Sequence, residues 1–478
     1  MSSETVITST PADSTKAETA STATPNPAIA KATVLPALVK HENPVYSWYV
    51  VIILMLCYAL AFIDRQILSL LVDPIKADLG ISDTQFGLLQ GLAFALFYTF
   101  VGLFLANLAD KKKRVKIIAI GVAAWSVMTA MCGLSKSFFH MFLARVGVAV
   151  GEAALSPAAY SIISDYFPKR KLGKAMSVYT AGVYLGSGLA FLIGGLLIVA
   201  LPDSLTLPIV GELKNWQLIF ISIGLPGLLF ALLSLTIREP KRGRYQTATD
   251  IKVDKPSSVE NEQSITHSLK FFKSKWPMFV QHNIGFAMLT LVGYAFHSWA
   301  PSFFIRTMAW SPEKTGMVYG TIAIIASPLG VLCGGILGDW ILKRGYNDAF
   351  FKVPFYGAIA LLLPAGFATL TTDTTLVLTL ITLLMFFSSF HGGMAVASLH
   401  TITPIQYRAQ ATAIYLFVIN LIGLGLGPVL VAVLTDYVFQ DPTAVGKSLS
   451  LVSFIIIPIA ILLLWRTKAM YNRKYNQK

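Results

Sequence analysis

The stretch LAFALFYTFVGLFLANLADKKKRVKIIAIGVAAWSVMTAMC, residues 92–132, decides the fold class. An apolar run ends at Asp110, four basic residues follow, and a second apolar run begins almost at once. Each run is close to the roughly 20 residues that an α-helix needs to cross a hydrocarbon core of about 30 Å. The stretch therefore predicts two membrane-spanning helices joined by a short basic loop.

The rest of the chain repeats this pattern. Of its 478 residues, 55% are hydrophobic and only 13% are charged, which is about half the charged share of a soluble protein. A soluble globule of this size could not cover its surface with so few polar side chains. We therefore expect an all-α membrane protein with twelve transmembrane helices, in the approximate segments 46–71, 84–108, 115–134, 137–164, 173–199, 216–237, 277–305, 313–338, 352–371, 374–402, 410–435 and 447–466.

A polar stretch divides these segments into two sets of six. We expect an N-terminal half at 44–237, a cytoplasmic linker at 238–276 and a C-terminal half at 277–466. Residues 1–43 are rich in Ser, Thr, Ala and Pro and lack the apolar core of a signal peptide. They are expected to form a disordered cytoplasmic tail, and residues 467–478 a second, short tail.

The basic residues set the expected orientation. Lys and Arg are concentrated in the tails, the linker and alternate loops, which places both termini in the cytoplasm of an inner membrane. This bias explains the net charge of +14 without a nucleic-acid partner. The three cysteines form no CxxC pair, so neither a disulfide framework nor a metal site is expected. No GxxxxGK[ST] loop is present, and we expect no cofactor.

The two halves carry related loops. Leu108-Ala109-Asp110 and a basic run follow the second segment, and Leu337-Gly338-Asp339 and Lys343-Arg344 follow the eighth. Both loops resemble the signature loop of the major facilitator superfamily. The resemblance implies two pseudo-symmetric six-helix halves with substrate bound between them near the midplane. It also implies gating at the cytoplasmic helix ends by Asp110, Lys111, Arg114, Asp339 and Arg344.

Further stretches resemble the Spinster lineage of that superfamily. They are Ala61–Arg65, Gly87–Gln90, Arg145–Ala153, Leu185–Gly188 and Gly427–Val429. Members of the lineage move lysolipids or sphingolipid-like amphipaths, often with proton coupling. We therefore expect a monomer whose partners are the lipid bilayer, protons, and an amphipathic or small anionic substrate.

Four charged residues fall inside the predicted spans, where a charge costs about 2.5–3.5 kcal/mol unless it faces a cavity or a partner. Glu152 is expected to couple protons or bind substrate; the alternative is a structural pair with Arg145, which is seven residues away on the same helix. Arg145 would hold either an anionic headgroup or Asp64. Asp64 and Arg65 are consecutive and diverge by about 100°. One of them would face the cavity and the other a neighbouring helix. Alternatively, both would be solvated at the end of the first helix.

The C-terminal half offers mainly His297, His391, His400 and Asn420 as polar candidates, so we expect a cavity that is charged on its N-terminal wall and apolar on its C-terminal wall. The leading hypothesis is a secondary transporter that moves an amphipath by proton-coupled alternating access. A proton symporter of small organic anions is the alternative. An embedded enzyme lacks a nucleophile–base pair, and a sensor lacks a sizeable soluble domain, so we expect no enzyme activity.

Overall fold

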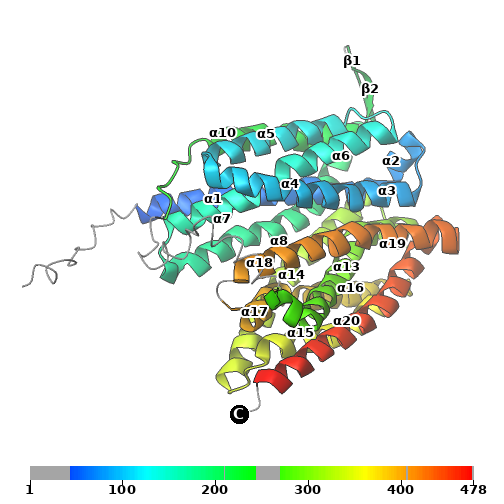
Figure 1. Cartoon of the computed structure of the whole chain (residues 1–478). Coiled ribbons are helices and arrows are strands. Elements are labelled where there is room, and N and C mark those ends of the chain that lie inside the picture. Colours follow the sequence, from blue (N-terminus) through cyan, green and yellow to red (C-terminus); the bar gives the residue numbers. More distant parts are fainter. Residues whose placement is uncertain (1–42, 209, 244–269, 405–406, 476–478) are drawn as a thin grey trace, which may run out of the picture. The chain divides into compact units, whose positions relative to one another are not determined.

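The computed structural model describes residues 43–208, 210–243, 270–404 and 407–475. The predicted N-terminal tail lies outside these residues except for Asn43, as do most of the linker and the last three residues. We call the spans before the linker the N-half and the spans after it the C-half (Figure 1).

The N-half contains six spans, of which three are interrupted and one is followed by a short 3-10 turn. The interruptions lie at Gly91, at Ala153–Ala154 and at Leu225–Pro226. The elements are α1 (Pro44–Gln66) with the 3-10 turn η1 (Ile67–Leu70), α3 (Asp83–Gln90) with α4 (Leu92–Lys111), α5 (Arg114–Cys132), α6 (Phe138–Glu152) with α7 (Leu155–Tyr166), α8 (Lys169–Ala200), and α9 (Asn215–Gly224) with α10 (Gly227–Ser234). A short helix, α2 (Val72–Leu79), connects α1 to α3, and an antiparallel hairpin of β1 (Ser204–Leu207) and β2 (Gly211–Lys214) connects α8 to α9.

The C-half repeats the arrangement. Its elements are α13 (Trp276–Arg306), α14 (Pro312–Lys343), α15 (Ala349–Phe367), α16 (Thr374–Ser389) with α17 (Gly392–Ile402), α18 (Arg408–Val418) continued by η3 (Ile419–Leu426), α19 (Gly427–Val433) and η4 (Leu434–Phe439), and, after the turn η5 (Pro442–Ala444), α20 (Val445–Tyr475).

These elements confirm the predicted all-α membrane fold. In the described residues, eleven helices are long and apolar enough to cross a membrane. The seventh predicted span corresponds to α13, which has 31 residues but carries Gln281, His282, Asn283 and His297. Each predicted segment coincides with one span to within several residues. The largest differences are at the ends of α14 and α20, which run past the predicted boundaries.

Two local breaks lie at a close contact between the halves. A Cβ atom on Gly91, between α3 and α4, would lie 2.6 Å from the carbonyl oxygen of Gly425 in the other half. Gly425 belongs to η3, a π-helical stretch that precedes Gly427-Pro428. Proline cannot donate a backbone hydrogen bond, which favours such a widened turn before it. The missing side chains let the two backbones touch.

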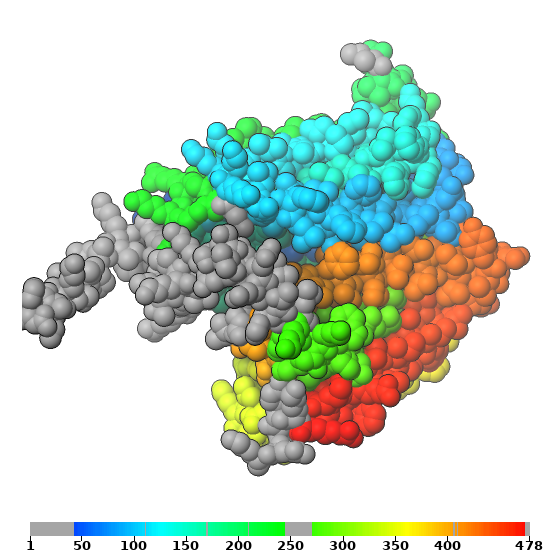
Figure 2. All heavy atoms as spheres, viewed as in Figure 1, coloured from blue at the N-terminus to red at the C-terminus, as the bar shows by residue number. Residues whose placement is uncertain are grey.

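The halves meet mainly at one end of the spans. We call the end near the β1–β2 hairpin the hairpin end, and the opposite end, where residues 238–243 follow α10, the linker end. Phe86 packs on Trp299, and Phe191 packs on Tyr319, both toward the hairpin end. Among the described residues, no hydrogen bond or ion pair joins the halves at the linker end. The hairpin itself projects from the helices (Figure 2).

Candidate functional site

The centre of the N-half contains a buried ion pair. Arg65 on α1 donates from Nε to Oε2 of Glu152 on α6 over 2.6 Å, and its terminal NH2 nitrogen lies 2.5 Å from the same oxygen. Arg65 is 8% exposed and Glu152 is 2% exposed. The carboxylate therefore pairs with Arg65 from another helix, and the intrahelical pair with Arg145 does not form. Oε1 of Glu152 has no partner among the described residues.

Aromatic rings enclose the Arg65 guanidinium. Its central carbon lies 4.8 Å from the ring centre of Phe62, 4.6 Å from that of Phe94 and 4.7 Å from that of Tyr98. Cation–π attraction stabilises a desolvated guanidinium by up to about 2 kcal/mol. The guanidinium is thus in contact with three rings in addition to Glu152.

Asp64 points away from Arg65, as the 100° divergence predicts. Its Oδ2 accepts a hydrogen bond of 3.2 Å from Thr129 on α5, and Oδ1 has no partner among the described residues. Arg145 donates to the backbone carbonyl of Asp64 over 3.3 Å. Asp64 and Arg145 are 0% and 1% exposed, so neither is solvated at a helix end. Both face the interior of the N-half.

A cavity of about 170 Å³ lies between the halves, halfway along the spans. Side chains from α1, α8, α13, α14 and the α16–α17 junction line it. Among the described residues, neither Lys nor Arg lines the cavity. Its polar side chains all carry a hydroxyl, amide or imidazole group: Gln66, Tyr184, Ser187, Thr290, Tyr294, His297, Ser327, Ser388, Ser389 and His391.

Arg65 lies at one edge of this cavity. A small gap lined by Arg65, Gln90 and Ser298 shares Gln66 and Tyr294 with the larger space. The only cation near the cavity therefore comes, within the described residues, from the N-half. The N-half wall is therefore charged, as expected. The C-half wall is polar and not apolar as expected, because it is lined by Thr290, Tyr294, His297, Ser327, Ser388, Ser389 and His391.

Two of the four polar residues expected in the C-half line the cavity. His297 and His391 do so, and Nδ1 of His297 has no partner among the described residues. His400 hydrogen-bonds to Thr412 and does not line the cavity. Asn420 lies on η3 and is not a lining residue. The sequence analysis missed Tyr294, although Thr290, Tyr294 and His297 follow one another at helical spacing. Such a polar stripe on an apolar helix was the available signal.

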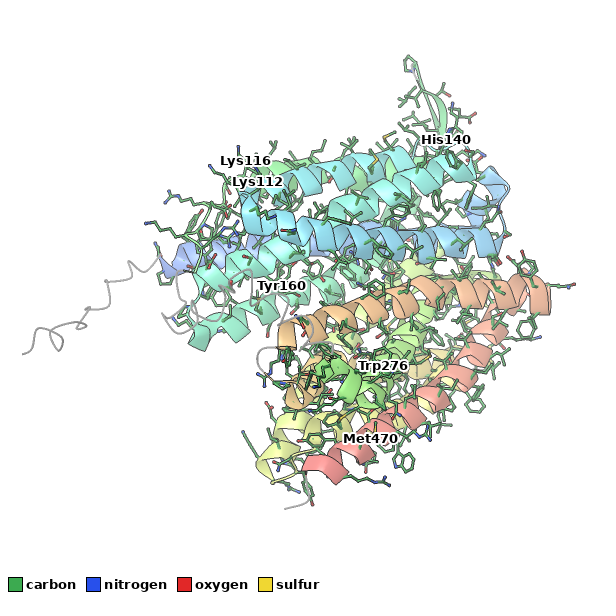
Figure 3. All side chains as sticks on the ribbon, viewed as in Figure 1. Lys112, Lys116, His140, Tyr160, Trp276 and Met470 are labelled. Carbon is green, nitrogen blue, oxygen red and sulfur yellow. The ribbon has the colours of Figure 1, made fainter. Side chains whose placement is uncertain are left out.

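An aromatic wall leads from the cavity toward the linker end. Phe62 lines the cavity and packs against Tyr58 with ring centres 5.3 Å apart. Tyr58 stacks on Tyr179 at 4.8 Å, and Tyr179 contacts Tyr160 at 5.2 Å. Tyr160 is 40% exposed and is labelled in Figure 3. Phe62 and Tyr179 are 5% and 0% exposed, so Tyr160 contributes the exposed ring of this aromatic wall.

The signature-loop residues make no cross-half pair in the part of the chain that is described. Arg114 is buried and pairs with Asp165 of the N-half at 2.5 Å and with Glu239, at the start of the linker, at 2.7 Å. Lys111, Asp339 and Arg344 are exposed, and Arg344 lies over the Trp340 ring. The Asp110 side chain is outside the described atoms.

The ion pairs that join the halves lie at the hairpin end instead. Arg306 at the end of α13 contacts Asp73 at 2.6 Å and Asp83 at 2.8 Å. The Asp83 side chain is fully buried and also pairs with Lys76. We call Arg306, Asp73 and Asp83 the hairpin-end latch. Beside it, both the backbone N–H and the hydroxyl of Thr84 donate to Asp436 of the C-half.

Known proteins are similar to this chain in sequence and in fold. The model of the Major Facilitator Superfamily matches residues 54–428. The chain belongs to the Major Facilitator Superfamily. It is 28% identical to an MFS-type efflux pump of Mycolicibacterium smegmatis, over 91% of this chain and 95% of that protein. It is 27% identical to protein spinster homolog 1 of Xenopus laevis, over 84% of this chain and 75% of that protein.

A solved structure extends the likeness to the fold. It is a bacterial homologue of the human lysosomal transporter Spinster, in an inward-facing and unoccupied conformation. The two chains are 27% identical with a TM-score of 0.72, and the match covers 90% of this chain and 97% of that one. The protein is therefore a multi-pass membrane transporter of the Spinster lineage and not an enzyme.

Proposed function

We propose that this transporter moves an amphipathic substrate with an anionic headgroup, such as a lysophospholipid, together with a proton. Three features support the proposal: the polar cavity, the aromatic wall beside it and the Arg65–Glu152 pair at its edge. The headgroup would enter the cavity, and the hydrocarbon chain would lie along Tyr58 and Tyr160.

The Arg65–Glu152 pair is the observation that carries the coupling mechanism. While Glu152 is ionised, it occupies the guanidinium of Arg65. A proton on Glu152 removes its charge and weakens this pair. The guanidinium, still held by its aromatic rings, can then bind a phosphate or carboxylate with its planar fork. Proton and substrate would thus load together, which corresponds to symport.

Alternating access follows from the two ends of the spans. We propose that the linker end faces the cytoplasm, because Lys and Arg are concentrated there. The latch holds the hairpin end closed, so the cavity would open inward. Asp110, Lys111, Arg114, Asp339 and Arg344 would close the linker end in the opposite state, by pairs that break when it opens.

Uptake into proteoliposomes tests the substrate class. Labelled lysophosphatidylcholine, lysophosphatidylglycerol and a small sugar acid are offered separately, with the lumen alkaline by one pH unit. We expect lysophosphatidylglycerol to accumulate and the sugar acid to stay at the level of empty vesicles. Tyr160→Ala should slow lysolipid uptake severalfold because it shortens the aromatic wall, whereas Tyr437→Ala, an exposed ring on η4, should not.

The opposite pattern would contradict the lipid substrate. Accumulation of the sugar acid, unaffected by Tyr160→Ala, would establish the alternative of a small-anion symporter. The cavity weakens this alternative, because within the described residues the C-half supplies no Lys or Arg to its lining.

A further inference from the structure

A second site lies at the linker end of the C-half, away from the central cavity. A groove of about 280 Å³ runs between the start of α13 and the last turns of α20. Figure 3 labels Trp276 on α13 and Met470 on α20, and Figure 2 shows these two helices side by side. The groove is lined by Ser274, Lys275, Pro277, Met278, Met470 and Arg473.

The groove is cationic. Lys275 and Arg473 are the charged residues of its lining, and no acidic residue lines it. Two more lysines, Lys270 and Lys273, are exposed on the helical turns that lead into α13. The neighbouring carboxylate of Asp348 is largely buried and is paired with Lys352, so it does not neutralise the groove. A negatively charged ligand is therefore favoured.

The same groove also lies at the boundary between water and hydrocarbon. Trp276, which precedes the lining residue Pro277, is 61% exposed on the outer side of the bundle. Tryptophan favours this boundary, because its ring is amphipathic. Met278 and Met470 form an apolar floor beneath the two cations. A ligand that fits must join an anionic group to an apolar part.

We propose that this groove binds the headgroup of an anionic phospholipid from the leaflet at the linker end. Arg473 would hold the phosphate with its planar fork. Lys275, whose Nζ donates to the carbonyl of Ile402 and lies over the Phe271 ring, would supply a second charge. The acyl chains would run along Met470 and Trp276. Basic pockets between helix ends are used in this way by other membrane proteins.

Binding would tie the end of the linker to two helices of the C-half. Lys275 directly precedes α13, Met278 lies in its first turn, and Arg473 lies in the last turn of α20. A bound lipid would hold the last residues of the linker against the C-half. This site does not depend on the identity of the transported substrate.

Lipid titration of the full-length protein tests the proposal. Phosphatidylglycerol is added to the purified protein in detergent, and bound lipid is counted by native mass spectrometry. Each basic residue near a membrane surface contributes about 1 kcal/mol to the binding of anionic lipid, which is about fivefold in affinity. We therefore expect Arg473→Gln to weaken binding about fivefold and the double variant with Lys275→Gln to weaken it about 25-fold. Phosphatidylcholine should bind far more weakly to every variant.

Lys468→Gln is the matched control. It removes one positive charge from the same helix, but Lys468 lies over the rings of Phe355 and Tyr356 on α15. Its binding of phosphatidylglycerol should change less than twofold. If Arg473→Gln fails to fold, Arg473→Lys keeps the charge and should retain most of the binding. Equal losses in Lys468→Gln and Arg473→Gln, or equal binding of phosphatidylcholine, would overturn the site.

Discussion

Replacing Glu152 by glutamine is expected to abolish proton-driven accumulation while leaving exchange of substrate across the membrane intact. Glutamine resembles the protonated carboxyl, so Arg65 would be released from its pair permanently. A difference of one pH unit corresponds to about 1.4 kcal/mol per coupled proton. It therefore supports about tenfold accumulation in the native protein, and this factor should fall to about one in Glu152→Gln.

The experiment compares gradient-driven uptake with counterflow, in which unlabelled substrate inside the vesicles exchanges for labelled substrate outside. Glu212→Gln, an exposed change on β2, is the control and should behave like the native protein. Loss of counterflow together with accumulation would show that Glu152 holds the structure or the substrate. Full accumulation in Glu152→Gln would contradict its role in coupling.

Replacing Arg306 by glutamine should shift the protein toward the state that opens at the hairpin end. Arg306 makes charged hydrogen bonds to Asp73 and Asp83 across the two halves. Hydrogen bonds to charged groups contribute about 1.5–3 kcal/mol each, but Asp73 is partly exposed, so its share is smaller. We expect a net loss of about 2–3 kcal/mol, which changes the ratio of the two states roughly 30- to 150-fold.

Labelling of a buried position reports this shift. Ser298→Cys, placed in a background with Cys333→Ser, puts a thiol in the small gap beside Arg65, where Ser298 is 3% exposed. A membrane-impermeant maleimide added at the hairpin end should react much faster once Arg306→Gln is introduced. Lys314→Gln removes a charge near the same end without touching the latch and should not accelerate labelling. Equal rates in all three proteins would show that the latch does not hold this end closed.

The fold could be predicted from the sequence because a membrane span has a length and a polarity that one segment reveals. The exceptions are physically informative. The seventh span is less apolar because it carries Gln281, His282, Asn283 and His297, the last of which faces the polar cavity. The breaks at Gly91 and Gly425 reflect contact between halves, which no single segment shows.

The sequence could predict which charged residues form the site, but not which of them pair with each other. Asp64, Arg65, Arg145 and Glu152 stand out because ionisable residues are rare inside spans. The partner of Glu152 is 87 positions away in the sequence, and only packing of α1 against α6 brings it within 2.6 Å. The spacing within one helix disfavoured Arg145 as a direct partner but could not supply Arg65.

The latch was missed for a different reason. Arg306, Asp73 and Asp83 lie at helix ends, where a charge carries no desolvation penalty by itself and resembles an ordinary loop residue. The burial of Arg306 and Asp83 belongs to the closed hairpin end and would disappear when it opens. A residue whose environment depends on the conformational state gives no signal in the local sequence.

The most direct test of the proposed coupling is the internal pH of proteoliposomes when substrate is added without any other gradient. A trapped fluorescent pH indicator reports proton movement while the potential is clamped at zero with potassium and valinomycin. We expect lysophosphatidylglycerol added outside to acidify the lumen of vesicles that contain the native protein. It should not acidify vesicles that contain Glu152→Gln, although labelled substrate should enter both. Substrate entry without acidification in the native protein would contradict the proposed coupling.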